Sequence, residues 1–126
     1  PPVLLFETLS FQQQIEAFNN VDILVSAHGA LLTGIFFMHR CSAVIEVFPT
    51  GYGRTRYFGT LSAISGVNHS FVYLGNDMVA ESARNKRPRQ TWKARSAHLC
   101  APVHALVEAV RLQIDQWNKC CDINAA

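Results

Sequence analysis

The chain has 126 residues, of which 49% are hydrophobic and 16% charged, and its formal net charge is +2. This composition is typical of one folded domain and excludes a disordered chain. So small a net charge points to neither nucleic acid nor a membrane surface as a partner, and the longest apolar run is far shorter than the ~20 residues that cross a bilayer. The sequence begins with Pro1 and Pro2, without an initiator methionine, so we expect a fragment or a processed chain.

Residues 7–38 predict a helix, a strand and a second helix. Ser10 and Gln13 have the spacing of a capping box, and an apolar face at helical spacing follows at Phe11, Ile15 and Phe18. The next run, 21–26, is almost wholly apolar, which is typical of a strand covered on both faces. His28 and Gly29 then form a turn, and residues 30–38 have helix-compatible spacing.

Residues 43–74 repeat this alternation. A second apolar strand, 43–48, ends at Pro49, and the glycine-containing turn 50–53 follows it. Tyr57, Leu61 and Ile64 mark one face of a helix, Gly66 suits its C-terminal cap, and 70–74 is a third strand. We therefore predict a Rossmann-like α/β fold for residues 7–75, with a doubly wound parallel sheet.

The last part of the chain divides into a basic segment and a helix. Residues 76–101 are polar, lack periodicity and carry six basic residues, so we expect a long solvated loop: Arg84, Lys86, Arg87, Arg89, Lys93 and Arg95. Pro102 suits a first helical turn, and a helix is expected over 102–119 with an apolar face at Val103, Leu106, Val107, Val110, Ile114 and Trp117. The whole of 1–126 is then a single, partial domain.

The turn at His28 is the first candidate site. Ligands of open α/β sheets lie at the carboxyl ends of strands, where the N–H groups of a following helix face anions. Gly29 lets the backbone approach a ligand closely and permits a positive φ. His28 either contacts a phosphate or hydroxyl, or is a turn histidine bonded to nearby backbone.

Two further candidates lie on the second strand and the turn after it. Glu46 lies within an apolar run, where an unpaired carboxylate is unfavourable, so it either binds ribose or sugar hydroxyls or pairs with Arg40 or Arg54. Gly51–Arg54 is either an anion cradle or an ordinary loop.

The remaining motifs favour no metal and no covalent chemistry. No D-x-D pair offers carboxylates to a divalent cation, and neither a P-loop nor a G-x-S-x-G elbow occurs. Cys41, Cys100, Cys120 and Cys121 match no zinc spacing; their number permits disulfides, but we expect free thiols. Residues 68–70 form a weak N-glycosylation sequon.

Several motifs, in this order, resemble the catalytic domain of glycosyltransferase family 61. An Asp22-bearing strand leads into His-Gly-Ala-Leu-Leu-Thr at 28–33, where the family has His-Gly-Ala-Gly-Leu-Thr-Asn, and Phe37-Met38 and the Glu46 strand follow. Residues 9–15 are similar to the family's LSF-x-x-Q helix start, and 57–66 resemble its next helix. The resemblance covers 6–73. Leu31 replaces the family's second glycine, and Gly34 replaces its asparagine.

This resemblance implies a GT-B architecture of two Rossmann-like domains, of which the chain is similar to the C-terminal, donor-binding half. The family is inverting and metal-independent, and it includes plant xylosyl- and arabinosyltransferases and animal O-linked N-acetylglucosaminyltransferases of the endoplasmic reticulum. It implies a location in the Golgi or endoplasmic reticulum lumen, with a membrane anchor in a segment not in this chain. The acceptor-side N-terminal domain and the catalytic base are expected outside it too.

We therefore expect the donor-binding part of a glycosyltransferase that moves a sugar from a nucleotide sugar, UDP-linked, to a glycan or protein acceptor. No metal or other cofactor and no nucleic acid partner are expected. The expected donor-binding residues are His28, Gly29, Ala30, Thr33, Glu46, Gly51 and Arg54. The alternative is a non-catalytic nucleotide-binding module or a degenerate glycosyltransferase-like one.

Overall fold

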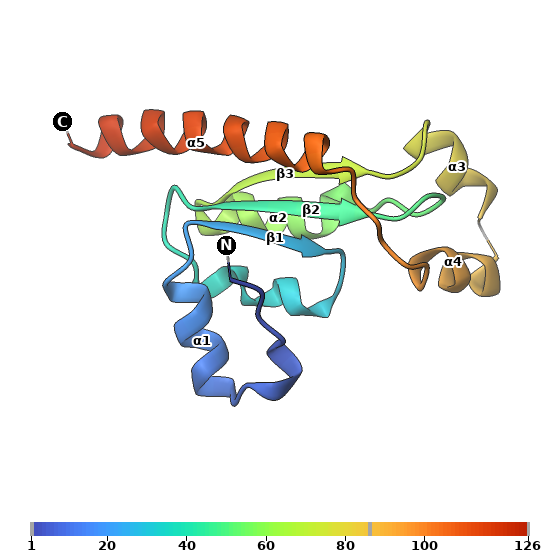
Figure 1. Cartoon of the computed structure of the whole chain (residues 1–126), viewed down its shortest axis with the longest axis horizontal. Coiled ribbons are helices and arrows are strands. Elements are labelled where there is room, and N and C mark those ends of the chain that lie inside the picture. Colours follow the sequence, from blue (N-terminus) through green and yellow to red (C-terminus); the bar gives the residue numbers. More distant parts are fainter. Residues whose placement is uncertain (1, 86, 126) are drawn as a thin grey trace.

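A three-stranded parallel sheet organises the computed structural model, which describes residues 2–85 and 87–125 (Figure 1). Its strands β1 (Ile23–Ala27), β2 (Ala43–Phe48) and β3 (Asn68–Tyr73) lie in the order β1-β2-β3. The predicted α/β class and parallel sheet are confirmed. The prediction of a doubly wound sheet is wrong for the described residues: the order advances in one direction, so right-handed crossovers place both connecting helices on one face.

Helical segments fill the connections between the strands and cover the sheet. They are η1 (Phe6–Thr8), α1 (Phe11–Asn19), η2 (Ala30–Phe37), α2 (Thr55–Ser65), α3 (Met78–Arg84), α4 (Pro88–Arg95) and α5 (Val103–Ala125), where η marks a 3-10 helix. The segments η2 and α2 pack on each other, while α5 lies along β3 and also contacts β2 (Figure 1).

The central strand β2 is buried along its whole length. Val44 belongs to the core that η2 and α2 cover, together with Leu32, Ile35 and Phe58. Because side chains alternate across a sheet, Ile45 lies on the opposite face, where it is also fully buried. We predicted a strand covered on both faces for the run 21–26, and that prediction is wrong, because Val25 of β1 is 43% exposed.

The predicted capping box begins α1. The Ser10 hydroxyl accepts the Gln13 N–H at 3.3 Å, and the Gln13 side chain accepts the Ser10 N–H at 2.8 Å. Of the predicted apolar face, Phe18 is buried, whereas Phe11 is 69% exposed. The helix therefore contacts the core mainly through its C-terminal half.

The expected helix after His28 is a 3-10 helix, η2, and its packing explains one of the departures from the family motif. A β-carbon at Gly34 would collide with the ring of Phe18. An asparagine at this position therefore cannot coexist with Phe18 as it is placed here. Leu31 packs against the same core, on the side of η2 that faces α1.

The helix α2 buries a different face from the predicted one. Tyr57 and Ile64 are 71% and 75% exposed, whereas Phe58 and Ser62 are buried. Apolar spacing alone did not distinguish these faces, because the buried face is set by the sheet beneath it. Gly66 ends the helix in the left-handed conformation, with φ of 70°, as its position predicts.

The prediction of a loop over 76–101 is wrong for much of the segment, which contains α3 and α4. Asp77 caps α3 by accepting the Ala80 N–H at 2.9 Å, and Pro88 occupies the first turn of α4. Capping and proline placement outweighed the missing apolar periodicity. Lys86 lies outside the described residues.

The C-terminal helix α5 begins one residue after Pro102 and continues beyond the predicted end at 119. Only part of its predicted face is covered, because Val103, Val107 and Ile114 are more than 40% exposed. Near its end, Cys120 forms a disulfide with Cys41 in the turn before β2. None of the described helices is long and apolar enough to span a membrane.

The expectation of free thiols is thus wrong for Cys41 and Cys120. It holds for Cys100, which is free and exposed, and the side chain of Cys121 lies outside the described residues. The sequon residue Asn68 pairs with Ala43 within the sheet, and its side chain donates to the Cys41 carbonyl at 3.4 Å.

We expect Gly34→Ala to lower the free energy of unfolding by about 2 kcal/mol, because the new methyl group overpacks the contact with Phe18. Urea denaturation measures the loss. Adding Phe18→Leu should recover part of it, so the two changes should not be additive. Gly29→Ala is the matched control: its backbone is extended and its new β-carbon meets no atom within 4 Å. An equal loss in both single variants would contradict this packing.

Cys120→Ser should destabilise the chain by up to about 4 kcal/mol, because the disulfide closes a loop with a sequence separation of 79 residues. Thermal unfolding with and without reductant measures the effect, and reductant should have little further effect on the variant. Cys100→Ser is the control, since that thiol is exposed and unpaired. Equal melting temperatures for the Cys120 variant and the oxidised parent would rule out this disulfide.

Candidate functional site

The candidate site lies at the carboxyl edge of the sheet, where β1 and β2 end toward α3 and α4 (Figure 1). His28 directly follows β1, and its N–H donates to the Val47 carbonyl at 3.0 Å. This bond extends the pairing of β1 with β2 by one residue and fixes the histidine at the strand end. The structure therefore places His28 at a strand end, as predicted.

Glu46 is the centre of a buried polar cluster. Its side chain is fully buried, and its two oxygens accept hydrogen bonds from His28 Nδ1 and, at 2.8 Å, from His69 Nε2. Of the two alternatives for Glu46, pairing with Arg40 or Arg54 is not what the structure shows, because His28 and His69 supply the hydrogen bonds to both of its oxygens. The carboxylate lies behind His28 and does not line the cavity described below.

The hydrogen bonds keep this carboxylate ionised. Burial alone would raise the pKa of Glu46, but the hydrogen bonds and charges of His28 and then His69 outweigh it and hold that pKa below its usual 4.5. An ionised carboxylate only accepts hydrogen bonds. Both histidines must therefore present N–H groups to it, which fixes the orientation of each ring.

Aromatic rings enclose the imidazole of His28. Phe48 stacks on it with a centroid distance of 5.0 Å, and Phe58 and Tyr52 lie at 5.4 and 5.2 Å. The Tyr52 hydroxyl is 3.1 Å from Nε2, and only 8% of the His28 side chain is exposed. The ring nitrogen of His28 that does not face Glu46 is thus already bonded to Tyr52.

A cavity of about 360 Å³ opens beside this histidine. It is lined by His28, Gly29, Ala30, Thr33, Tyr52, Arg54, Tyr57, Phe58 and Arg95. Five of the seven predicted site residues therefore line one cavity, and no carboxylate does. Gly29 has an extended backbone, with φ of 177°, so it provides open space and not the positive φ that we expected to be possible.

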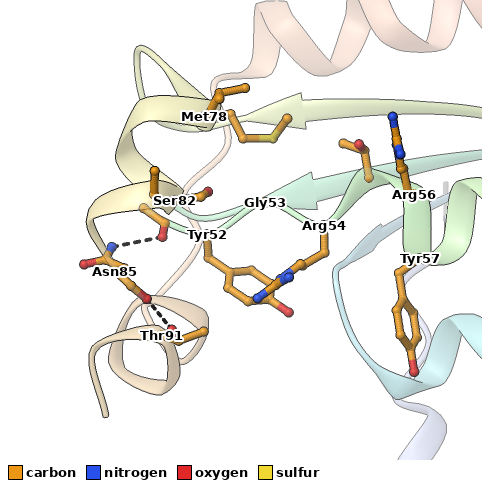
Figure 2. Close-up of a pocket in the computed structure, with 13 residues that line it drawn as sticks. Tyr52, Gly53, Arg54, Arg56, Tyr57, Met78, Ser82, Asn85 and Thr91 are labelled. Atoms are coloured by element: carbon orange, nitrogen blue, oxygen red, sulfur yellow. Dashed lines mark hydrogen bonds between the residues drawn. The ribbon is translucent and has the colours of Figure 1, made fainter. Parts of the chain in front are cut away.

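A second cavity, of about 790 Å³, adjoins the first and shares Tyr52, Arg54 and Tyr57 with it. Figure 2 shows its walls: the segment 51–57 on one side and Met78, Ser82 and Asn85 on the other. The predicted residue Gly51 lines this second cavity. The hydroxyl oxygen of Ser82 is buried here, without a hydrogen-bond partner among the described residues.

Polar contacts from two later segments hold the loop between β2 and α2. Gly51 has a left-handed φ of 80°, its N–H donates to the Tyr73 hydroxyl at 2.8 Å, and its carbonyl accepts from Asn85 at 2.9 Å (Figure 2). Tyr73 in turn donates to Glu81, and burial, together with this hydrogen bond, raises the pKa of Tyr73. The loop that carries Tyr52 and Arg54 is therefore anchored to β3 and α3.

Sequence reasoning missed three residues of the site. Tyr52 was included only as part of a glycine-containing loop, and His69 only as the middle of a sequon. Arg95 was assigned to a solvated loop, yet it ends α4 and faces the same cavity as Arg54. The sequence carried no signal for His69, because the register that pairs β3 with β2 beside Glu46 is set by the fold.

Among the described residues, no group of three or more histidine, cysteine, aspartate or glutamate side chains is arranged to hold a metal ion. The groups available to a ligand are instead guanidinium, hydroxyl and backbone N–H donors. Such donors suit a multivalent anion.

A cavity at the carboxyl edge of a parallel sheet is the arrangement in which α/β proteins bind nucleotides. Comparison with known proteins makes the class more specific, since residues 3–45 match the model of the Glycosyltransferase 61 family. The resemblance to family 61 is thereby confirmed over the segment that carries β1, the His28 turn and η2.

Vertebrate relatives named protein O-linked-mannose beta-1,4-N-acetylglucosaminyltransferase 2 also match. The zebrafish (Danio rerio) protein is 34% identical over 74 residues, 57% of this chain and 13% of that protein. The Bos taurus protein is 29% identical over 88 residues, 68% of this chain and 15% of the relative. The chain thus spans a small part of the length of these relatives.

We expect Glu46→Gln to destabilise the protein by about 2 kcal/mol, because an amide cannot accept a hydrogen bond from both histidines without turning an NH₂ group toward one of them. The effect should depend on pH. Because folding lowers the pKa of Glu46, the stability that its ionised form contributes is present above the unfolded-state pKa, about 4.3, and is lost as the pH falls through the folded-state pKa.

Urea denaturation at several pH values measures both effects, and the acid-dependent loss should be smaller in the variant than in the parent. Glu108→Gln, on the exposed face of α5, is the matched control and should change stability by less than about 0.5 kcal/mol. The same acid-dependent loss in parent and Glu46 variant would show that this carboxylate is not the group responsible.

Proposed function

We propose that this chain is the donor-binding part of an inverting, metal-independent glycosyltransferase that uses a UDP-linked sugar. The observation that carries the proposal is the cavity beside His28, where Arg54, Arg95 and the N-terminus of η2 meet and no carboxylate faces them. Guanidinium groups and free N–H groups at a helix start are the donors that bind phosphate without a metal. The same donors would stabilise the leaving diphosphate during transfer.

The two adjoining cavities suit the two parts of a nucleotide sugar. The smaller one, with its cationic lining, would take the diphosphate beside Gly29, Ala30 and Thr33. The larger one, between segment 51–57 and α3, would take the nucleoside. Its apolar wall at Met78 offers a face to a nucleobase.

The acceptor and the catalytic base belong, in this proposal, to parts of the protein outside this chain. The relatives are named for adding N-acetylglucosamine to O-linked mannose on protein, which supports a glycan or glycoprotein acceptor. The Cys41–Cys120 disulfide supports a Golgi or endoplasmic reticulum lumen location, because such bonds persist in oxidising compartments. A missing N-terminal domain would supply the acceptor side of the cleft.

The alternative is a nucleotide-binding module without transferase activity, which the motif departures at 31 and 34 favour. The packing of these residues weakens this alternative. Leu31 faces α1 and does not line the diphosphate cavity, and Gly34 lies under Phe18. Neither departure thus obstructs the proposed donor site.

The chain should bind UDP-N-acetylglucosamine, and Arg54→Ala and Arg95→Ala should each weaken binding by about tenfold or more, the effect of losing a charge-assisted hydrogen bond. Calorimetric or NMR titration measures the affinity, which a chelator should leave unchanged. Arg89→Ala is the matched control, because it lies on α4 with Arg95 but lines neither cavity.

Equal losses in the Arg89 and Arg95 variants would favour a diffuse polyanion surface over a defined donor site. The chain alone should transfer no sugar to an acceptor glycopeptide, since the base is proposed to lie outside it. Detectable transfer would contradict that assignment.

A further inference from the structure

Tyr52 occupies the junction of the two cavities and is also the outermost member of the buried cluster. It lines both cavities, it is 9% exposed, and its hydroxyl bonds to Nε2 of His28. Figure 2 shows its ring extending from the loop on the side away from Met78 and Ser82. A single hydrogen-bonded series therefore runs from His69 through Glu46 and His28 to a hydroxyl group at the cavity.

The buried carboxylate sets the direction of every bond in this series. Glu46 accepts the Nδ1–H of His28, so a neutral imidazole there has Nε2 as its acceptor nitrogen. The Tyr52 O–H must then donate to Nε2. In this state the phenolic oxygen presents only lone pairs to the cavity, which repel the oxygens of a phosphate.

Protonation of His28 reverses the direction of the hydrogen bond between its Nε2 and the Tyr52 hydroxyl. Both ring nitrogens of an imidazolium are donors, so Nε2–H donates to the Tyr52 oxygen and the Tyr52 O–H is free to turn outward. The added proton comes from solvent and stays on Nε2, and no covalent bond to Tyr52 forms or breaks. The hydroxyl changes from an acceptor to a donor for whatever occupies the cavity.

We propose that the Tyr52 hydroxyl turns outward and donates a hydrogen bond to the diphosphate when His28 is protonated. Binding of the nucleotide sugar then takes up one proton at His28. The proposal rests on the function proposed above and adds a positioning residue and a pH dependence to it. The diphosphate favours the protonated ring in two ways: its negative charge lies nearby, and its oxygen accepts the released O–H.

The charged and titratable groups around His28 come from every element packed against it. They are Glu46 of β2, His69 of β3, Tyr52 and Arg54 of the loop, Tyr57 of α2 and Arg95 of α4. Glu46 stays ionised through the range in which histidines titrate, because its pKa is lowered. The arginines stay charged throughout that range. Histidine protonation is therefore the event that can change the hydrogen bonding of Tyr52.

The test measures the affinity for UDP-N-acetylglucosamine between about pH 8 and about pH 5, the range in which histidines titrate. The diphosphate of this ligand has no group that titrates there, so a change in affinity reports on the protein. We expect binding to tighten by about tenfold as the pH falls, which corresponds to one linked proton over about one pH unit. Calorimetry in buffers of different ionisation enthalpy should show the matching proton uptake.

Tyr52→Phe should reduce this pH dependence to less than about twofold while the protein stays folded, because the ring is kept and only the hydroxyl is lost. Tyr57→Phe is the matched control: Tyr57 lines the same two cavities and should keep the parent's pH dependence. A purely structural role for Tyr52 would lower affinity equally at all pH values. An unchanged pH dependence in Tyr52→Phe would overturn the proposal.

Two further results separate this proposal from the donor site itself. Binding by the parent without pH dependence would overturn the reversal and leave the donor site standing, whereas no binding at any pH would overturn both. A ligand-free measurement stands independently: ¹⁵N NMR of the free protein above about pH 8 should show a protonated Nδ1 and an unprotonated Nε2 in His28. The opposite tautomer would overturn the proposal without any ligand.

Discussion

The buried carboxylate of Glu46 is the constraint on which the rest of this site depends. A charged group without solvent contact is tolerated only when its oxygens are fully hydrogen-bonded, and here the two donors come from the residue after β1 and from β3. One side chain therefore joins all three strands at the carboxyl edge of the sheet. It also fixes the orientation of His28, and through His28 that of the Tyr52 hydroxyl.

Around this fixed centre, the ligand-facing groups come from segments far apart in the sequence. Arg54 directly precedes α2, Arg95 ends α4, and the start of η2 provides backbone donors. The loop between them is anchored through Gly51 to Tyr73 and Asn85. The basic segment thus contributes one specific cation to a cavity, while the core below it is held by packing and by the disulfide from α5 to the turn before β2. Such anchoring limits the movement that would accompany binding of an anion.

Core packing explains the two departures from the family motif, and neither departure changes the proposed binding surface. Leu31 and Phe18 fill space between α1 and η2, and Gly34 accommodates the Phe18 ring. A motif read along the sequence treats each position as a possible ligand contact. In the fold, Ala30 and Thr33 of η2 line the cavity, whereas Leu31 and Gly34 pack toward the core and α1, so a change at 31 or 34 alters packing.

The local features of this protein could be predicted from its residues alone: the α1 capping box, the apolar strand β2, the cap at Gly66 and the strand-end position of His28. These depend on neighbouring residues and on apolar patterning, which a sequence records directly. Four contacts became known only from the tertiary structure. His69 donates the second hydrogen bond to Glu46, Arg95 lines the cavity, Cys41 is bonded to Cys120, and Phe58 is buried where Tyr57 had been predicted. The reason is physical: strand register and the packing of distant helices set these contacts, and no local spacing encodes them.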